Sequence, residues 1–121
     1  MGKSFGTWGE DLAAEYLERL GWQIVERNWR CSAGEIDLVA LEPVHGSPPI
    51  GVIIEVKTRH GVGYGDPLEA ITSAKIARLR RLACRWRSEC GLELSDLRVD
   101  AIGILKRPGL AANMTHLAGV A

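Results

Sequence analysis

The sequence lacks the features that mark several common classes of protein. Its cysteines, Cys31, Cys84 and Cys90, are odd in number and have no CxxC spacing, so a disulfide framework and a zinc site are both poor interpretations. No run approaches the roughly 18 apolar residues of a membrane-spanning helix, and residues 1–5 contain no hydrophobic region of a signal peptide. These absences predict a cytoplasmic protein with free thiols.

The sequence also lacks an excess of charge of either sign, because 15 Lys and Arg residues balance 15 Asp and Glu residues. Zero net charge argues against strong non-specific binding of nucleic acid. The charges are nevertheless unevenly placed, since residues 75–87 hold several Lys and Arg side chains and no acid. Such a basic strip can contact phosphates even in a neutral molecule. The 121 residues suffice for one core, so we expect a single domain over residues 1–121.

The most informative residues that are present are carboxylates inside two apolar segments. One segment carries Glu35 and Asp37, and the next carries Glu55 and Lys57. Strand side chains alternate between the two faces of a sheet, so the residues of each pair share one face. A hairpin centred on Gly46 would place Asp37 opposite Glu55. The same register would place Glu35 opposite Lys57.

Carboxylates placed opposite each other repel, and unpaired charge is costly on a face that is partly covered. A divalent cation would remove the repulsion, because Mg²⁺ binds one or two carboxylates together with water and a substrate phosphate. A bound metal can activate water and stabilise charge on a phosphodiester, and a nearby lysine can orient that water. The alternative is a solvated face with cross-strand Glu–Lys pairs. Spacing alone does not decide, since an acid followed two residues later by lysine is common.

Hydrophobic periodicity predicts an α/β domain with a mixed central sheet. The expected elements are a helix over 8–20 capped by Thr7, strands over 22–27, 34–41 and 50–58, a helix from Pro67 to Glu89 with a possible break near Thr72 and Ser73, a strand over 97–105 and a short strand over 115–120. Ile36, Leu38 and Ala40 are expected on one apolar face. Arg98 and Asp100 are expected to be structural partners, and His116 could contact solvent or substrate.

Both predicted helices carry charged residues whose roles the pattern leaves open. Glu10 lies at the edge of the first apolar face, where it could reach a site beneath the helix or interact only with the helix dipole. Lys75 falls inside the second apolar stripe, where it could point toward the carboxylates or snorkel to solvent. Arg78, Arg81 and Arg85 share an outward face, which is either solvated or a track for backbone phosphates.

These residues also carry a family resemblance. Asp37, followed by Glu55-Val56-Lys57, resembles the bipartite metal site of the PD-(D/E)xK nuclease superfamily. An ordered set of blocks over about residues 6–118 resembles, more specifically, the YraN family of small bacterial proteins similar to Holliday-junction resolvases. The blocks are Gly9-Glu10, Arg27-Asn28-Trp29-Arg30, Gly34-Glu35-Ile36-Asp37-Leu38, Glu55-Val56-Lys57-Thr58-Arg59, Gly65-Asp66-Pro67, Lys75 and Arg98-Val99-Asp100. Ile36 replaces the proline that precedes the aspartate in the superfamily motif, which the superfamily tolerates.

The resemblance implies a restriction-endonuclease-like core with the order helix, three strands, helix, strand. The catalytic residues that it implies are Glu10, Asp37, Glu55 and Lys57. The implied ligands of Mg²⁺ or Mn²⁺ are Asp37, Glu55 and the carbonyl of Val56. Glu35 and Lys75 are implied as supporting residues. Lys57 would orient the attacking water or stabilise the developing charge. Glu10 would act beside the metal or at a second metal, and Glu35 would assist the metal or pair with Lys57.

The leading functional hypothesis is therefore a metal-dependent nuclease-like protein acting on DNA, including branched or structured DNA. Arg59, Lys75 and the arginines of the second helix, Arg78, Arg81 and Arg85, would hold the DNA backbone. Symmetric cleavage of a junction would require a homodimer. A second hypothesis is a catalytically silent nucleic-acid-binding module of the same fold. A third is a structural domain in which the acids and lysines form only salt bridges.

Overall fold

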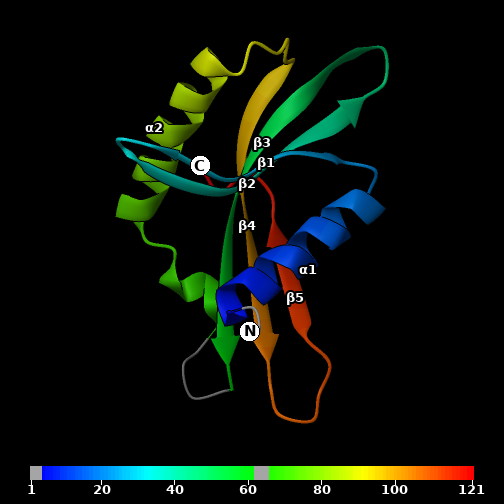
Figure 1. Ribbon diagram of the computed structural model, residues 1–121, viewed down its shortest axis with the longest axis vertical. Helices are drawn as coiled ribbons and strands as arrows, with labels where there is room; N and C mark the ends of the chain where they lie inside the picture. Colours follow the sequence, from blue (N-terminus) through cyan, green and yellow to red (C-terminus); the bar gives the residue numbers. More distant parts are fainter. Residues whose placement is uncertain (1–3, 62–65) are drawn as a thin grey trace.

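The computed structural model describes residues 4–61 and 66–121, which form a five-stranded sheet with a helix against each face (Figure 1). The elements are α1 (Phe5–Arg19), β1 (Gln23–Cys31), β2 (Gly34–Val44), β3 (Ser47–His60), the 3-10 helix η1 (Pro67–Ala70), α2 (Ser73–Glu89), β4 (Asp96–Lys106) and β5 (Asn113–Leu117). The strands lie in the order β1-β2-β3-β4-β5, with β3 and β4 parallel and the other neighbours antiparallel. The predicted α/β class with a mixed sheet is confirmed.

The helix ends are set by capping side chains. α1 starts at Phe5 rather than at residue 8, because Ser4 is the cap: its Oγ accepts a hydrogen bond of 3.1 Å from the backbone N–H of Thr7. The predicted break in the second helix is confirmed, since Thr72 caps α2 and accepts from the N–H of Lys75. Within the two described ranges, no helix is both long and apolar enough to cross a membrane.

Most strands are longer than predicted. β1 continues to Cys31 instead of ending at residue 27, and β3 begins at Ser47 instead of residue 50. β5 is displaced, because it ends at Leu117 while the prediction ran to residue 120. Gly65, the first residue of the predicted start of the second helix, lies outside the described residues.

The predicted register of the β2–β3 hairpin is confirmed over most of its length. Leu38 pairs with Ile54 at one end of the ladder and Glu42 pairs with Ile50 near the turn. The backbone ladder was expected to continue to Asp37 and Glu55, but its last recorded pair is Leu38 and Ile54. Asp37 instead binds β3 through its side chain, since its Oδ2 accepts a hydrogen bond of 2.8 Å from the N–H of Val56.

Two hydrophobic clusters cover the sheet. The cluster under α1 contains Ala13, Ala14, Leu17, Leu38, Ala40, Val52, Ile54, Ile102 and Ile104, and the cluster under α2 contains Ile36, Val39, Ile53, Leu79, Leu82, Ala83, Trp86 and Val99. Ile36 was expected on the face of Leu38, yet it packs with Val39 under α2. Strict alternation of side chains is therefore interrupted in β2 beside Asp37.

Candidate functional site

Asp37 lies at the end of the β2–β3 ladder, where its carboxylate is partly buried. Burial and the charge of the Glu55 carboxylate raise the pKa of Asp37 to about 7, although the N–H of Val56 and the charge of Lys57 oppose that rise. A carboxyl group with such a pKa is in an environment that disfavours its ionised form. The ordered backbone donor nevertheless fixes the orientation of the carboxylate.

Glu55 and Lys57 supply opposite charges beside Asp37. The side chain of Glu55 is only 10% exposed, and the Nζ of Lys57 lies 3.2 Å from its Oε1. Lys57 thus pairs with Glu55 on its own strand and not with Glu35, the partner that the hairpin register suggested. Lys75, near the start of α2, lies next to Lys57, and contact with that ammonium lowers the pKa of Lys75. Lys75 therefore borders the Lys57 ammonium, and the charge of Glu55 also acts on it.

A second pair of acids, Glu10 and Glu35, is joined by Asn28. With its side-chain nitrogen turned toward the carboxylates, Asn28 donates to Glu35 Oε1 at 2.9 Å and to Glu10 Oε1 at 3.3 Å. Partial burial, with a smaller contribution from the charge of Glu35, raises the pKa of Glu10. Arg30 also forms an ion pair of 3.2 Å with Glu35 across β1 and β2. The charge of Glu10 in turn raises the pKa of Asp37, so the two acidic pairs are neighbours.

Close packing of α1 on β3 brings Glu10 to this position. Gly9 is buried in α1, and a Cβ atom at that position would overlap Cγ2 of Thr58. Only glycine therefore allows this approach of helix and strand without a shift of one of them. Glu10 follows Gly9 directly, and its carboxylate lies beside Asn28 of β1 and near enough to Asp37 of β2 to raise the pKa of that carboxyl.

The predicted basic residues occupy different surroundings. Arg78 is exposed in α2, and its charge contributes to the lowered pKa of Lys75, so it borders the site. Arg81 is exposed on the same helix. Arg85 is engaged within the chain, because its Nε lies 2.6 Å from Glu89 Oε2 and its Nη1 donates to Ser32. Arg59 lies two residues beyond Lys57 in β3, and its Nη1 donates to the carbonyl of Thr58.

The donor atoms gathered at Asp37 and Glu55 fit a hard divalent cation better than a soft one. Among the described residues, no group of three or more His, Cys, Asp or Glu side chains could hold an ion alone. Mg²⁺ does not require such a group, because it commonly keeps several waters and binds one or two carboxylates and a substrate phosphate. Asp37, Glu55 and the carbonyl of Val56 therefore fit Mg²⁺ or Mn²⁺ as an incomplete ligand set.

Asn28 is the residue of this cluster to which sequence reasoning gave no role. Its φ of 52° is the only positive value found at a non-glycine residue in the described ranges. Asparagine tolerates this left-handed conformation better than most residues, and such backbone strain is concentrated at functional sites. The sequence signal for a role of Asn28 was a polar asparagine next to an apolar strand position. Nothing in the sequence indicated which carboxylates it would bind.

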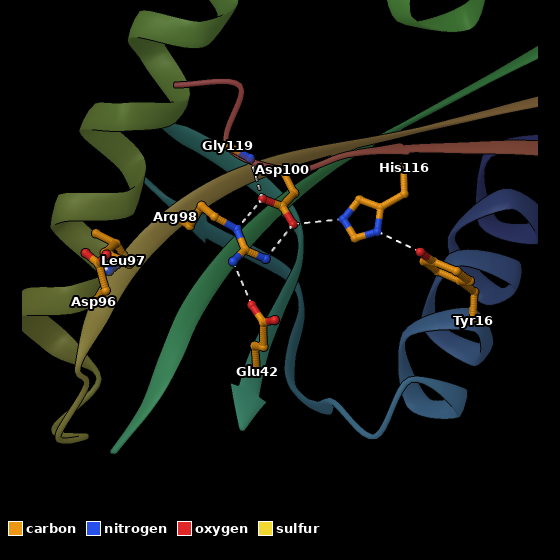
Figure 2. A network of polar contacts seen from close by, with 8 residues as sticks. All are labelled: Tyr16, Glu42, Asp96, Leu97, Arg98, Asp100, His116 and Gly119. Atoms are coloured by element: carbon orange, nitrogen blue, oxygen red, sulfur yellow. Dashed lines mark hydrogen bonds and ion pairs between the residues drawn. The ribbon is translucent and has the colours of Figure 1, made fainter. Parts of the chain in front are cut away.

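A second polar network is centred on Asp100 (Figure 2). Arg98 donates to both oxygens of the fully buried Asp100, at 2.8 and 3.0 Å, and to Glu42 at 2.6 Å. Asp100 also lies 2.8 Å from Nε2 of His116, whose Nδ1 lies 2.8 Å from the hydroxyl of Tyr16. The structural partnership predicted for Arg98 and Asp100 agrees with this network, which joins α1, β2, β4 and β5.

Comparison with known proteins places the chain in a family. The model of the family described as "Uncharacterised protein family UPF0102" matches residues 9–104. The chain belongs to this family. The UPF0102 protein of Renibacterium salmoninarum is 47% identical over 115 residues, which cover 95% of this chain and 93% of that protein. A UPF0102 protein of Nocardioides sp. is 43% identical over 118 residues, covering 98% and 91%, and one of Arthrobacter sp. is 49% identical over 115 residues, covering 95% and 93%.

The UPF0102 assignment confirms the resemblance to the YraN family. The matched range contains Asp37, Glu55 and Lys57, together with Glu10 and Asn28. The names of these UPF0102 relatives state the family and no activity. The chemistry of the site must therefore be argued from its own residues.

Proposed function

We propose that this UPF0102 protein is a divalent-metal-dependent nuclease that hydrolyses phosphodiesters of DNA, with branched or structured DNA as the substrate class. One observation carries the proposal: the partly buried carboxylates of Asp37 and Glu55 repel each other beside Lys57, and the pKa of Asp37 is raised to about 7. Burial without a cation makes this arrangement unfavourable for folding. Its retention in the fold is understandable if the residues bind a cation and phosphate.

The element order supports a restriction-endonuclease-like core. α1 precedes three antiparallel strands, β1 to β3, and α2 then leads to β4, which is parallel to β3. This is the order helix, three strands, helix, strand that the PD-(D/E)xK resemblance implies. The carboxylates come from β2 and β3, so the central strands of the sheet hold them in place.

Each site residue has a role that follows from its contacts. Asp37 is oriented by the N–H of Val56 and would, with Glu55 and the carbonyl of Val56, hold Mg²⁺ or Mn²⁺. The bound ion would lower the pKa of a water molecule and offset phosphate charge. Lys57, held by Glu55, would donate a hydrogen bond to the attacking water or to the phosphate.

The acids and cations around this centre would support the same reaction. Asn28 holds Glu10 and Glu35 together, which keeps further carboxylate oxygens beside Asp37. Lys75 borders Lys57, and the exposed Arg78 and Arg81 continue along α2. Together with Arg59 these cations would hold the DNA backbone on either side of the carboxylates. Symmetric cleavage of a junction would in addition require a homodimer.

The first prediction concerns the two proposed ligands, Asp37 and Glu55. We expect Asp37→Asn and Glu55→Gln each to reduce Mn²⁺-dependent cleavage of a four-way junction by more than about 100-fold. Mutation of residues that only orient metal ligands already lowers metal affinity or activity about 10- to 100-fold, and loss of a ligand itself should lower it further. Gel electrophoresis of labelled junctions measures the rate, and circular dichroism checks the fold. Glu18→Gln is the matched control, since Glu18 is exposed on α1. Cleavage at the wild-type rate in both ligand variants would remove these residues from the mechanism.

A second candidate is the silent nucleic-acid-binding module. It is favoured by the basic face of α2, where Arg78 and Arg81 are exposed and have no ion pair within the described part of the chain. This candidate predicts DNA binding that a chelator leaves unchanged and that Arg78→Glu with Arg81→Glu weakens. It also predicts no cleavage by the wild-type protein. The comparison of binding and cleavage in the same samples therefore separates the two candidates.

A further inference from the structure

Three aromatic side chains are stacked where α1 meets the end of β3. The rings of Phe5 and His60 lie nearly parallel, with centroids 3.7 Å apart and an interplanar angle of 17°. Phe5 stacks in turn on Trp8, at 5.3 Å and 13°. His60 is exposed and terminates this stack, while Phe5 is half-buried. The chain thus presents an aromatic surface at the carboxyl ends of β3 and β4, beside the start of α1 (Figure 1).

Two open hollows share His60 in their linings. The first, of about 500 Å³, is lined by Phe5, Thr58, Arg59 and His60. The second, of about 350 Å³, includes Lys106 and Arg107 in its lining. Volumes of this size are typical of sites for small ligands or single nucleotides. Both hollows therefore border the same exposed imidazole ring.

The charge around these hollows is positive. Arg59, Lys106 and Arg107 line them, and no Asp or Glu is found among their described lining residues. Lys106 donates to the carbonyls of Arg107 and Leu110, contacts that hold its side chain without neutralising it. In the described ranges, no ion pair joins any of these three cations to a carboxylate. Phosphate oxygens would thus meet uncompensated positive charge.

An exposed aromatic surface flanked by uncompensated cations has the chemistry of a platform for single-stranded nucleic acid. A base stacks on the ring, and the cations bind the backbone phosphates. Paired bases within a duplex cannot use such a surface, because their faces are covered by the neighbouring base pairs. The platform therefore selects an unpaired or displaced base over an intact duplex.

The platform and the proposed catalytic centre lie near the same end of β3, on its two faces. His60 is three residues beyond Lys57, about 10 Å along β3 at the ~3.3 Å rise per residue of a strand, and its side chain projects from the opposite face, toward α1. Phe5 precedes Glu10 by five residues of α1, or about 7.5 Å at 1.5 Å per residue. These spans correspond to roughly two or three base steps of 3.4 Å. A nucleic-acid strand that reaches both sites would thus pass around the end of β3, with the platform a few nucleotides from the scissile phosphate.

We infer that the Phe5–His60 stack is a binding site for an unpaired nucleotide, with Arg59 and Arg107 on the adjoining phosphates. The inference deepens the proposed function and rests on it for the position of the cleaved bond. It names the substrate feature, an unpaired base within a few nucleotides of that bond. The stacking interaction itself requires neither metal nor catalysis.

The test measures binding in the presence of EDTA, so that a failure of the nuclease proposal does not affect it. The probes are a labelled oligothymidine and a labelled duplex of the same length, and fluorescence anisotropy gives the dissociation constants. We expect His60→Ala to weaken binding of the oligothymidine by about 5- to 150-fold, the range that stacking of one base contributes. Binding of the duplex should change by less than about twofold.

Two further variants serve as controls for chemistry and position. His60→Phe keeps an aromatic ring without a titratable nitrogen, and we expect it to retain oligothymidine binding. His45→Ala removes an exposed histidine from the turn at the opposite end of β3, and we expect it to leave binding unchanged. Equal losses for single strand and duplex in His60→Ala, or no loss for either, would overturn the inference. A loss in His60→Phe equal to that in His60→Ala would also overturn it, since stacking would then not be the cause.

Discussion

Asn28 and Gly9 show how single residues set the geometry of the acidic cluster, which consists of Glu10, Glu35, Asp37 and Glu55. Asn28 adopts a left-handed backbone conformation and binds Glu10 and Glu35 with the same amide nitrogen. Gly9 allows α1 to approach Thr58 closely enough to place Glu10 there. Neither residue carries charge, and neither is a proposed metal ligand. Their contribution is to fix the distance and orientation of residues that do.

The approach at Gly9 gives a prediction about stability. Gly9→Ala should destabilise the protein by about 1–3 kcal/mol, because its Cβ would overlap Cγ2 of Thr58 in a packed region. Gly6→Ala, in the same helix, should instead stabilise it by up to about 1 kcal/mol, since among the described residues only Ser4 Oγ, at 3.9 Å, would lie within 4 Å of the new Cβ. Denaturant unfolding measures both values.

The same prediction has an internal check. Thr58→Ser removes the methyl group that the new Cβ would overlap, so it should recover part of the loss when combined with Gly9→Ala. Equal stabilities of the Gly9→Ala and Gly6→Ala proteins would show that the packing of α1 on β3 is looser than described.

At the scale of elements, the hairpin of β2 and β3 separates what the sequence could predict from what it could not. The register followed from the turn at Gly46 and from alternation, and the pairs from Leu38 to Glu42 agree with it. The end of the ladder at Asp37 could not be predicted from the sequence. There the Asp37 carboxylate accepts the hydrogen bond from Val56 N–H, and such a side-chain contact leaves no periodic signal in the sequence. The packing of Ile36 under α2 was missed for the same reason.

The network around Asp100 ties four elements together and gives a pH prediction (Figure 2). Burial alone would raise the pKa of Asp100, but hydrogen bonds from Arg98, Gly119 N–H and His116 hold it below its ordinary value. In unfolded chains an aspartate titrates near pH ~3.9. The stabilisation from Asp100 should therefore be fully present above about pH 4 and be lost as the pH falls further.

Unfolding measured across pH for wild type and Asp100→Asn tests this prediction. At neutral pH we expect the variant to be less stable by about 3–5 kcal/mol, because Arg98 loses its buried partner. Below about pH 4 the difference should shrink, because Asp100 binds a proton in unfolded wild type while the folded protein still holds it ionised. Asp96→Asn is the control, since Asp96 is exposed in the same strand. A difference that stays constant down to pH 2, well below the titration range of aspartate, would contradict the account.

In the whole molecule, the acidic cluster is assembled from segments that are distant in sequence. α1 contributes Glu10, β1 contributes Asn28, β2 contributes Asp37, and β3 contributes Glu55 and Lys57. Sequence pattern and family resemblance predicted most of these residues, because each stands out as a polar residue in an apolar element. They could not predict the contacts between these residues, such as the ion pair of Lys57 with Glu55, since such contacts depend on how the elements pack.

The central claim is that Asp37 and Glu55 form a divalent-metal site, and thermal unfolding with Mn²⁺ or EDTA tests it most directly. For wild type, Mn²⁺ at a hundred times its dissociation constant should raise the free energy of unfolding by about 2.7 kcal/mol, which corresponds to a rise in Tm on the order of 10 °C. For Asp37→Asn the account predicts no rise with Mn²⁺. In EDTA the variant should be at least as stable as wild type, because the repulsion with Glu55 is gone. Equal shifts in both proteins, or no shift in either at millimolar Mn²⁺, would contradict the claim.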